Sequence, residues 1–329
     1  MQALFGQYDS YLSKMEKQMH VLFIDRDGAL RIQGREEDVN KAEKLILSLA
    51  DSIEKGSDLD MQRVDYAIEL TNEGQDPELS AMDSDCIAHT IAGKPIHPKT
   101  KGQADYVSAM RDHMIVFGLG PAGTGKTYLA MAMAIQAFKK NEVERIILTR
   151  PAIEAGEKLG FLPGDLQSKV DPYLRPLYDA LYQIMGAESF VRNMEKGLIE
   201  VAPLAYMRGR TLDNAYIILD EAQNTTQSQM KMFLTRIGFG SKVVITGDPT
   251  QKDLSADVRS GLDLAVEVLK NVEEIAFCTL TSRDVVRHPL VQKIVKAYEE
   301  YEKKESRAGR DRSERGNARG ADRRAKRGR

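Results

Sequence analysis

The stretch MIVFGLGPAGTGKTYLAMAMAIQAFKK, residues 114–140, decides the fold of this chain. An apolar run leads into the glycine-rich turn GPAGTGKT at 120–127 and then into an alanine-rich segment of helical character. The turn matches the pattern GxxxxGK[ST], and a strand before it with a helix after it is the context in which that match is meaningful. Gly120, Gly123 and Gly125 let the backbone curl so that successive N–H groups point at a phosphate. We therefore predict a phosphate-binding loop between a strand and a helix.

The residues of this loop have separate expected roles in binding ATP and Mg²⁺. The N-terminus of the following helix adds partial positive charge near the phosphates. Lys126 is expected to reach the terminal phosphates, and the hydroxyl of Thr127 to ligate Mg²⁺. The residues whose backbone would wrap the phosphates are Gly120, Pro121, Ala122, Gly123, Thr124 and Gly125. The competing interpretation is a glycine-rich turn with a surface lysine.

A second apolar run, in IILDEAQNTTQSQM at 217–230, breaks abruptly into Asp220 and Glu221. An aspartate at a strand end beside a phosphate loop suits a residue that holds Mg²⁺ through water, and we assign this role to Asp220. Glu221 could then polarise an attacking water. This pairing favours ATP hydrolysis over transfer to a small acceptor, because a kinase must exclude water. A capped strand end with two solvated acids is the alternative.

A third strand end, in ITGDPTQKDL at 245–254, follows the same pattern. The apolar run stops at Gly247 and Asp248, and Gln251 follows at short range. A Gln close to a γ-phosphate can orient water and sense hydrolysis. We therefore add Asp248 and Gln251 to the predicted site. A tight Asp-Pro turn would explain the same sequence.

Short apolar runs recur through the middle of the chain and predict the fold class. They are MIVFGLG (114–120), RIILTR (145–150), LIEVAP (198–203), AYIILD (215–220), KVVITGD (242–248) and EIAFCTL (274–280). Segments with helical periodicity separate most of them, for instance 127–140 and 228–237. Strands alternating with helices indicate a parallel sheet with crossover connections, and near-continuous apolar strands indicate burial on both faces. We predict an α/β domain at 99–302.

The two ends of the chain differ from this middle region. Residues 1–55 are predicted to form a small α/β unit, in which strands at 20–25 and 29–34 precede an amphipathic helix. A polar linker with a helical segment around 61–72 is expected at 56–98. The last segment, 303–329, holds 12 Lys and Arg against 4 Asp and Glu and almost no apolar residue, which predicts a disordered basic tail. The rest of the chain is acidic, which the overall net charge of -2 conceals.

Bulk composition narrows the class of protein. Hydrophobic residues make up 42% and charged residues 29%, as in ordinary soluble globular proteins. No run approaches the roughly 18 apolar residues of a membrane span, and the N-terminus lacks the basic-then-apolar order of a secretory signal. Cys86 and Cys278 form no CxxC motif, which argues against a disulfide scaffold or a zinc site. We expect a cytoplasmic protein with no membrane partner.

Taken together, several segments resemble one known family. They are GPAGTGKTYLA, TRPAIEAGEKLGFLPGDL, PYLRPLYDAL, RGRTLDNAYIILDEAQN, GSKVVITGDPTQKDL and TSRDVVRHPLVQKIVKAYE, in this order from about residue 93 to 300. The set is similar to the PhoH-like ATPases and is far more specific than the phosphate loop alone. The resemblance implies a single RecA-like P-loop NTPase core, ATP hydrolysis, a part in RNA metabolism and ring-shaped, often hexameric homo-oligomers. It also suggests an endoribonuclease or the ribosome as a partner.

The same resemblance assigns further site residues. KTKGQADY at 99–106 is similar to a helicase segment in which a Gln reads adenine, here Gln103, and an amide has the donor and acceptor for this task. SRDVVRH at 282–288 lies where related helicases carry arginine motifs. Arg283 and Arg287 are spaced i, i+4 and would share a helix face, so either could stabilise γ-phosphate charge from a neighbouring subunit. For the segment 99–106 the alternative is a polar helix start. For the two arginines it is pairing with surface acids.

Other segments carry expected RNA contacts. TRPAIEAGEKLGFLPGDL at 149–166 corresponds to a helicase segment that touches nucleic-acid backbone, which points to Thr149, Arg150 and Lys158. A structural connection or a subunit contact is the alternative for this segment. Weaker candidates, for RNA or for the γ-phosphate, are Arg208, Arg210 and Arg236. The RG and RGR elements of the tail suit nonspecific, salt-sensitive RNA binding, or a solubilising role.

The N-terminal unit resembles the KH-like domain of this family, through the strand IQG and a following helix V-x-x-A-x-x-L-I. No GxxG loop, the element that clamps RNA backbone in such domains, lies between its helices, so docking or oligomerisation competes with RNA binding as its task. No segment remains for a nuclease domain, and we predict no cleavage. Two functions stay open: ATP-driven, helicase-like remodelling of RNA, or an ATP-gated scaffold that docks a partner nuclease. A small-molecule kinase is a weaker third interpretation.

Overall fold

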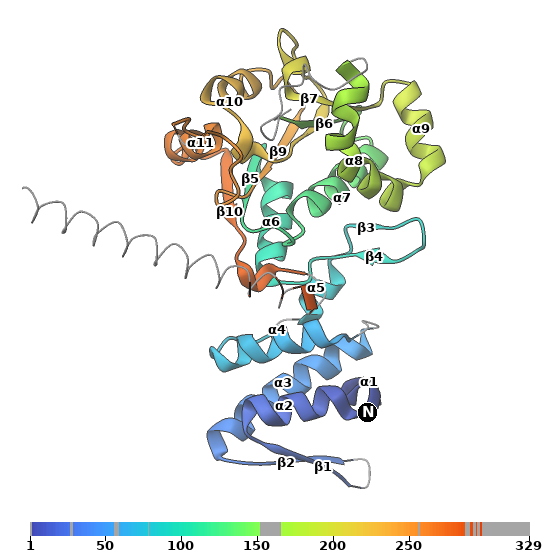
Figure 1. The fold of residues 1–329 in the computed structure, drawn as a ribbon. Helices are drawn as coiled ribbons and strands as arrows, with labels where there is room; N and C mark the ends of the chain where they lie inside the picture. Colours follow the sequence, from blue (N-terminus) through green and yellow to red (C-terminus); the bar gives the residue numbers. More distant parts are fainter. Residues whose placement is uncertain are drawn as a thin grey trace, which may run out of the picture. The chain divides into compact units, whose positions relative to one another are not determined.

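A six-stranded parallel sheet, built from strands between residues 115 and 279, is the largest sheet among the described residues of the computed structural model of this chain (Figure 1). The structure describes residues 2–26, 29–55, 59–77, 79–151, 166–255 and 257–286, and positions 290, 291, 294 and 297. Lys158, Arg287 and the basic tail lie outside the described residues. The chain divides into two units, Met1–Val286 and Arg287–Arg329, and the helices and strands described here belong to the first.

The strands of this sheet are those that the sequence predicts. They are β5 (Ile115–Leu119), β6 (Arg145–Arg150), β7 (Ile199–Pro203), β8 (Ala215–Leu219), β9 (Lys242–Gly247) and β10 (Ile275–Thr279). They run in the order β10-β5-β9-β8-β6-β7, and every neighbouring pair is parallel. All carboxyl ends therefore meet at one edge of the sheet, where ligands of such sheets bind. The predicted α/β class is confirmed.

Strand β8 shows why these segments are so apolar. Every residue of this strand is buried. Tyr216 and Ile218 pack into the hydrophobic cluster on one face of the sheet, whereas Ile217 and Leu219 pack into the cluster on the other face. Successive side chains of a strand point to opposite faces, so a strand covered on both sides must be apolar throughout. Burial of both faces also fixes the register of the strand.

Helices cover both faces of the sheet (Figure 1). One side carries α6 (Lys101–Asp112), α7 (Lys126–Lys139), α8 (Leu166–Met185) and α9 (Ala187–Glu195), and the other α10 (Gln227–Leu234) and α11 (Gly261–Leu269). Short 3₁₀ turns are η3 (Leu204–Met207), η4 (Ala222–Asn224) and η5 (Ser282–Asp284). The small, buried side chains Ala130, Ala132 and Ala134 let α7 pack closely in the core. This packing sets the N-terminus of α7 at the carboxyl edge.

The N-terminal part consists of helices and a two-stranded antiparallel hairpin. Its elements are α1 (Gln2–Phe5), η1 (Gln7–Asp9), α2 (Ser10–Met19), β1 (Leu22–Arg26), β2 (Ala29–Gln33), α3 (Glu36–Glu54), α4 (Met61–Asn72) and α5 (Leu79–Ser84). A small hairpin of β3 (Ala88–His89) and β4 (Pro95–Ile96) precedes α6. The two strands and the helix expected after them are present, while the KH-like assignment stays a prediction.

Helix α4 belongs to the hydrophobic core of this N-terminal part. One cluster joins Leu45 and Leu49 of α3 with Val64 and Ile68 of α4 and Leu79 of α5. The helix expected around 61–72 is therefore present, and the segment predicted as a linker contributes core residues. A domain boundary at residue 55 would cut through this cluster. The polar turns on both sides of α4 lower the apolar content of the whole segment, so its composition does not reveal the apolar face of the helix.

Both cysteines are free thiols, and their surroundings differ. Cys86 is exposed, whereas Cys278 lies half-buried in β10. Burial raises the pKa of the Cys278 thiol to about 11. Little reactive thiolate therefore forms there at neutral pH. Among the helices that the structure describes, none is long and apolar enough to cross a membrane.

Candidate nucleotide site at the carboxyl edge of the sheet

The glycine-rich loop joins the end of β5 to the start of α7, as the sequence predicts. Its glycines have positive φ angles, 145° at Gly120, 87° at Gly123 and 76° at Gly125. Glycine adopts such angles freely, whereas other residues are strained there. A Cβ at Gly120 would also collide with the carbonyl oxygen of Leu280, just beyond β10. The loop therefore needs glycine for its conformation and for its close approach to the neighbouring chain segment.

Lys126 is folded over this loop and is buried. Its Nζ donates to the carbonyl oxygens of Gly120 at 2.6 Å and Pro121 at 2.8 Å. A bound phosphate would replace these neutral acceptors by charged ones, which form shorter and stronger hydrogen bonds with an ammonium group. The lysine is thus placed inside the loop, and the alternative of a surface lysine is wrong.

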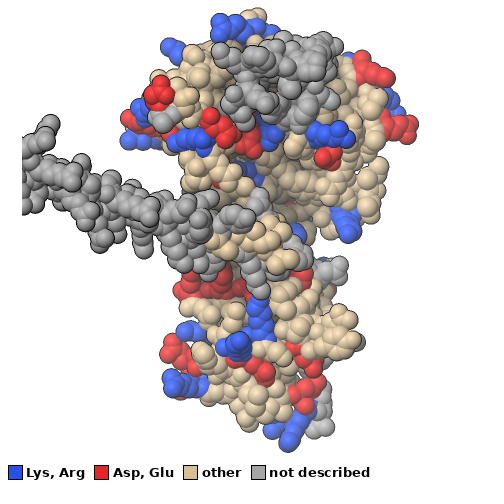
Figure 2. All heavy atoms as spheres, in the orientation of Figure 1, with Lys and Arg blue, Asp and Glu red and all other residues tan. Residues whose placement is uncertain are grey.

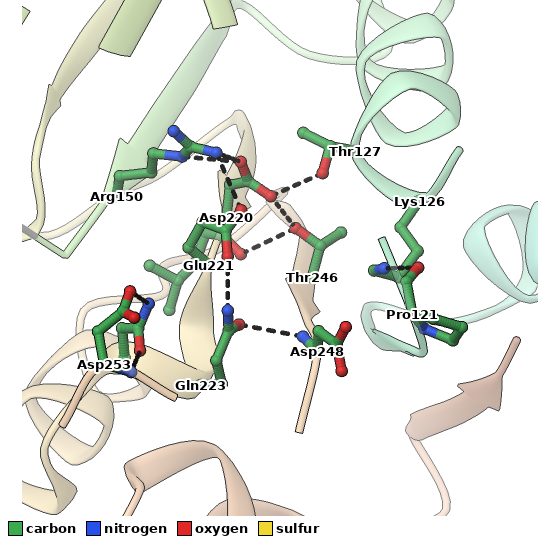
Figure 3. A network of polar contacts seen from close by, with 12 residues as sticks. Pro121, Lys126, Thr127, Arg150, Asp220, Glu221, Gln223, Thr246, Asp248 and Asp253 are labelled. Carbon is green, nitrogen blue, oxygen red and sulfur yellow. Dashed lines mark hydrogen bonds and ion pairs between the residues drawn. The ribbon is translucent and has the colours of Figure 1, made fainter. Parts of the chain in front are cut away.

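Asp220 and Thr127 meet in a buried polar network (Figure 3). Oδ1 of Asp220 accepts hydrogen bonds from the hydroxyls of Thr127 and Thr246, each at 2.6 Å. Asp220 follows β8, Thr127 lies in the first turn of α7 and Thr246 lies in β9, so three elements converge on one carboxylate oxygen. A hydroxyl and a carboxylate oxygen brought together in this way are oxygen ligands of the kind that Mg²⁺ takes, directly or through water. The residues present therefore fit a Mg²⁺ ion.

Glu221 has a strained backbone within this network. Its φ is 54°, in the left-handed region that side-chain-bearing residues rarely adopt, and it caps the turn η4. Strain of this kind costs about 1–3 kcal/mol and is concentrated at functional sites. Donors hold both carboxylate oxygens: Arg150 Nη2 lies 3.1 Å from Oε1 and Gln223 Nε2 lies 2.5 Å from Oε2. The structure thus fixes the orientation of the carboxylate that the sequence assigns to water activation.

Asp248 and Gln251 follow β9 but differ in placement. Asp248 is buried, and its Oδ1 accepts hydrogen bonds from the N–H and the hydroxyl of Thr250 at 2.9 and 2.7 Å. Its Oδ2 is buried without a hydrogen-bond partner among the described residues and is therefore an acceptor that a ligand could use. Gln251 is exposed, and its N–H closes a turn onto the Asp248 carbonyl at 3.1 Å. The tight turn is thus present, and the γ-phosphate role of Gln251 stays a prediction.

Gln103 is buried against the phosphate loop. Its Nε2 donates to the carbonyl oxygen of Thr124 at 3.0 Å, and its Oε1 accepts from the N–H of Lys99 at 2.7 Å. Thr100 caps the N-terminus of α6 next to it. The amide that was expected to read adenine therefore ties the start of α6 to the loop. Gln103 supports the loop in this arrangement, and adenine recognition stays a prediction.

The arginine motif after β10 begins with the short 3₁₀ turn η5. The turn η5 ends at Asp284 and Val285 is extended, so the described backbone after Arg283 is not a continuous helix; Arg287 lies outside the described residues. Arg283 is exposed and forms an ion pair with Glu73 at 2.6 Å, which is the surface pairing foreseen as the alternative. The physical reason is local. The buried carboxylate of Asp284 closes a capping box at η5. It also accepts a hydrogen bond from the hydroxyl of Thr100 at 2.6 Å, which anchors the turn to the start of α6.

Arg150 is a site residue that the sequence assigned to a different task. Its neighbour Thr149 is fully buried in β6, so the predicted contact of Thr149 with nucleic-acid backbone is wrong. Arg150 ends β6, and its Nη2 lies 2.8 Å from Asp220 Oδ2 and 3.1 Å from Glu221 Oε1. The signal that could have found it is its position at the carboxyl end of a predicted strand, which it shares with Asp220 and Asp248.

Gln223 is a second site residue that sequence analysis missed. It is buried, and besides its contact with Glu221 its Oε1 accepts from the N–H of Asp248 at 3.0 Å. One amide therefore joins the carboxyl ends of β8 and β9 (Figure 3).

Among the weaker arginine candidates, Arg210 forms a two-pronged ion pair with Glu200 at 2.6 and 2.7 Å. The guanidinium of Arg210 is therefore already engaged by a carboxylate.

Replacing Thr246 by valine is expected to lower the free energy of unfolding by about 1.5–3 kcal/mol, the usual cost of losing a hydrogen bond to a charged group. Valine keeps the shape of the side chain but removes a hydroxyl that the buried Asp220 accepts. Thr235→Val removes an exposed hydroxyl at the end of α10 and is the matched control. Urea unfolding of both variants measures the difference, and equal midpoints would show that the contact with Asp220 adds no stability.

The family model and the curated relatives agree on the family of this chain. The family model described as "PhoH-like protein" matches residues 95–299. A "PhoH-like protein" of Bacillus subtilis (strain 168) is 54% identical over 297 residues, which cover 90% of this chain and 93% of the relative. A "PhoH-like protein" of Synechocystis sp. is 50% identical over 300 residues, covering 91% of this chain and 92% of the relative. A solved structure, the Sulfolobus solfataricus SWI2/SNF2 ATPase core in complex with dsDNA, is similar at a TM-score of 0.31 and 18% identity over 46% of this chain and 31% of that chain. At that score the likeness to the solved structure decides nothing about this chain.

Proposed function

Because this chain belongs to the PhoH-like protein family, we propose that it is a Mg²⁺-dependent ATPase that couples ATP binding and hydrolysis to RNA metabolism. One observation carries the ATPase part: three strand ends converge on a single polar network. The phosphate loop follows β5, the acid pair Asp220 and Glu221 follows β8, and Asp248 follows β9. Strand β9 lies between the other two in the sheet, so the three groups face one ligand position.

The loop and the N-terminus of α7 would bind the triphosphate. Backbone N–H groups of the loop and the helix end would bind phosphate oxygens. Lys126 would exchange the carbonyl oxygens of Gly120 and Pro121 for the β- and γ-phosphates. Thr127 would hold Mg²⁺ directly and Asp220 would hold it through water, and the bound ion would neutralise charge on the phosphates. Gln103 keeps the expected role in adenine recognition as part of this proposal.

Hydrolysis needs a water aligned with the γ-phosphate. Glu221 would accept a hydrogen bond from that water and orient it, and the water oxygen would displace ADP to leave inorganic phosphate. Two donors already fix the plane of the carboxylate, while each oxygen keeps lone-pair capacity for the water. Asp248 and Gln251 would sense the γ-phosphate from β9. Arg283 or Arg287 of a neighbouring subunit would stabilise the transition-state charge.

The RNA part of the proposal rests on the family and on charge. Residues 303–329 hold 12 basic and 4 acidic side chains, and basic groups that neutralise RNA phosphates release counterions. On the face seen in Figure 2, Lys and Arg of the described residues are interspersed with Asp and Glu. We therefore assign RNA capture chiefly to the basic segment. A cytoplasmic homo-oligomer, hexameric in the form the resemblance implies, with an endoribonuclease or the ribosome as partner, completes the proposal.

A second candidate function is an ATP-gated scaffold that docks a nuclease without separating strands. A short segment next to the phosphate loop favours it. The N–H of Val286 donates to the carbonyl oxygen of Gly123 at 2.8 Å, and the preceding carbonyl, of Val285, accepts from Gln62 Nε2 at 2.8 Å. Gln62 lies in α4, so two hydrogen bonds connect the phosphate loop with the N-terminal helices. ATP could thus control a docking surface without strand separation.

Single-stranded RNA is expected to raise the ATP turnover of the full chain, and this stimulation should fall steeply between about 50 and 200 mM salt, because phosphate contacts release counterions. Steady-state ATPase assays with and without RNA at both salt concentrations test this, and omission of Mg²⁺ is the control. Strand separation is measured in parallel with and without ATP. ATP binding with negligible or RNA-indifferent turnover and no strand separation would instead support the scaffold.

A further inference from the structure

Arg150 is placed beside the acid pair by the register of the sheet. Strand β6 pairs with β8 so that Thr149 lies opposite Leu219, and the N–H of Asp220 donates to the carbonyl oxygen of Thr149 at 2.9 Å. The residues that end the two strands are therefore neighbours. This placement depends on backbone pairing of two central strands, so the position of Arg150 is set by the sheet and not by a loop.

The Arg150 guanidinium bridges two carboxylates (Figure 3). Its Nε and Nη2 lie 2.9 and 2.8 Å from Oδ2 of Asp220, and the same Nη2 lies 3.1 Å from Oε1 of Glu221. Only 18% of the arginine side chain is exposed. Adjacent carboxylates repel one another, and a partly desolvated guanidinium between them offsets that repulsion. The planar fork of arginine suits this task, whereas the point charge of lysine cannot bond the same two groups in the same geometry.

The two oxygens of Asp220 have separate partners. Oδ1 accepts from the hydroxyls of Thr127 and Thr246, on the side of the phosphate loop. Oδ2 accepts from Arg150. Arg150 therefore does not compete for the oxygen assigned to Mg²⁺. The arrangement also lets one arginine align Asp220 and Glu221 together, although Glu221 holds the strained φ of 54°.

We propose that Arg150 is a positioning residue for ATP hydrolysis. It holds the Glu221 carboxylate toward the attacking water, with Gln223 on the other oxygen, and it acts through the acid pair without touching the nucleotide. The inference rests on the proposed ATPase function and replaces the nucleic-acid contact that the sequence suggested for this residue. A residue with this role affects the chemical step more than the binding of substrate.

Arg150→Ala is expected to lower kcat by roughly 10- to 100-fold, somewhat less than the loss of a direct transition-state donor, and to leave KM for ATP within about threefold. Arg150→Lys should recover only part of the loss, because charge alone does not restore the fork. Arg145→Ala is the matched control. Arg145 begins the same strand, and its guanidinium donates to the carbonyl oxygen of Asp213 at the opposite edge of the sheet. Its kcat should equal that of the wild type.

A double-mutant cycle separates positioning from direct catalysis. If Arg150 acts through Glu221, adding Arg150→Ala to Glu221→Gln should change the single-turnover rate by less than about threefold, because effects of residues that act as a unit are not additive. Fully additive losses would overturn the positioning role, as would a loss confined to KM. Should Arg150→Ala fail to fold by circular dichroism, Arg150→Lys carries the same cycle.

The outcomes distinguish this inference from the function on which it rests. Wild-type turnover that Glu221→Gln abolishes, together with an Arg150→Ala rate equal to that of Arg145→Ala, would overturn the role of Arg150 and leave the ATPase standing. Absence of Mg²⁺-dependent hydrolysis in the wild type would overturn both. A kcat loss in Arg150→Ala with unchanged KM and a non-additive cycle supports the assignment.

Discussion

Replacing Lys126 by alanine is expected to weaken ATP binding by about 100-fold and to reduce kcat by a further 10²–10³-fold. The ammonium group lies inside the glycine-rich loop, 2.6 Å from the carbonyl oxygen of Gly120, where a bound triphosphate would take over its hydrogen bonds. A hydrogen bond to a charged group contributes about 1.5–3 kcal/mol, so the net loss of one such phosphate contact accounts for a roughly 100-fold change in affinity. A fixed cation that meets the charge developing in the transition state accounts for the loss in rate.

Calorimetric titration with Mg·ATP and steady-state ATPase assays measure the two effects of Lys126→Ala separately. Lys139→Ala, at the other end of the same helix and exposed, is the matched control. The unfolding temperature without nucleotide shows whether the loop itself survives, because Lys126 also bonds the loop carbonyls. ATP affinity within threefold of the wild type in a folded Lys126→Ala variant would mean that the nucleotide binds elsewhere.

The sheet is the part of the fold that the sequence predicts best. Each of its strands is covered on both faces, so residues such as Ile217 and Ile218 are all apolar and stand out against the polar turns around them. The loop glycines are equally predictable, because other residues are strained at their positive φ angles. Where one local requirement dictates the residue type, the pattern of residues along the chain is enough to predict the structure.

Side-chain partners that are distant in sequence are the part that was not predictable. Gln103 bonds Thr124 of the loop, Arg150 bonds Asp220, and Arg283 pairs with Glu73. Each of these contacts depends on tertiary packing that leaves no periodic signal in the sequence. The resemblance to helicase segments assigned roles to the same residues, but it could not show which of these side chains already form hydrogen bonds or ion pairs within the protein.

In the N-terminal part, tertiary packing likewise limits how well a domain boundary can be predicted from composition. The segment around α4 is polar on average, yet Val64 and Ile68 are fully buried against α3. A composition window averages the buried side of a helix with its exposed side. Burial of this kind follows from the partner that the helix meets, which lies elsewhere in the chain.

Glu221→Gln is expected to lower kcat by about 10²–10⁴-fold, the range for removal of a group that accepts a proton or orients water. ATP affinity should stay within a few-fold of the wild type, because the triphosphate is held by the loop and by Lys126. This variant should therefore bind nucleotide and retain it, which Lys126→Ala cannot do. Binding measured with a fluorescent ATP analogue, together with single-turnover hydrolysis, distinguishes the two variants.

The two donors on Glu221 predict a further effect of Glu221→Gln. Arg150 Nη2 and Gln223 Nε2 bond different oxygens of the Glu221 carboxylate, and an amide carries an acceptor oxygen at only one of those two positions. One donor is left facing an NH₂ group, which should lower the free energy of unfolding by about 1–3 kcal/mol. Glu195→Gln, at an exposed position of α9, is the control and should change neither rate nor stability. Wild-type turnover in Glu221→Gln would show that the strained backbone at this residue serves packing and that another group aligns the water.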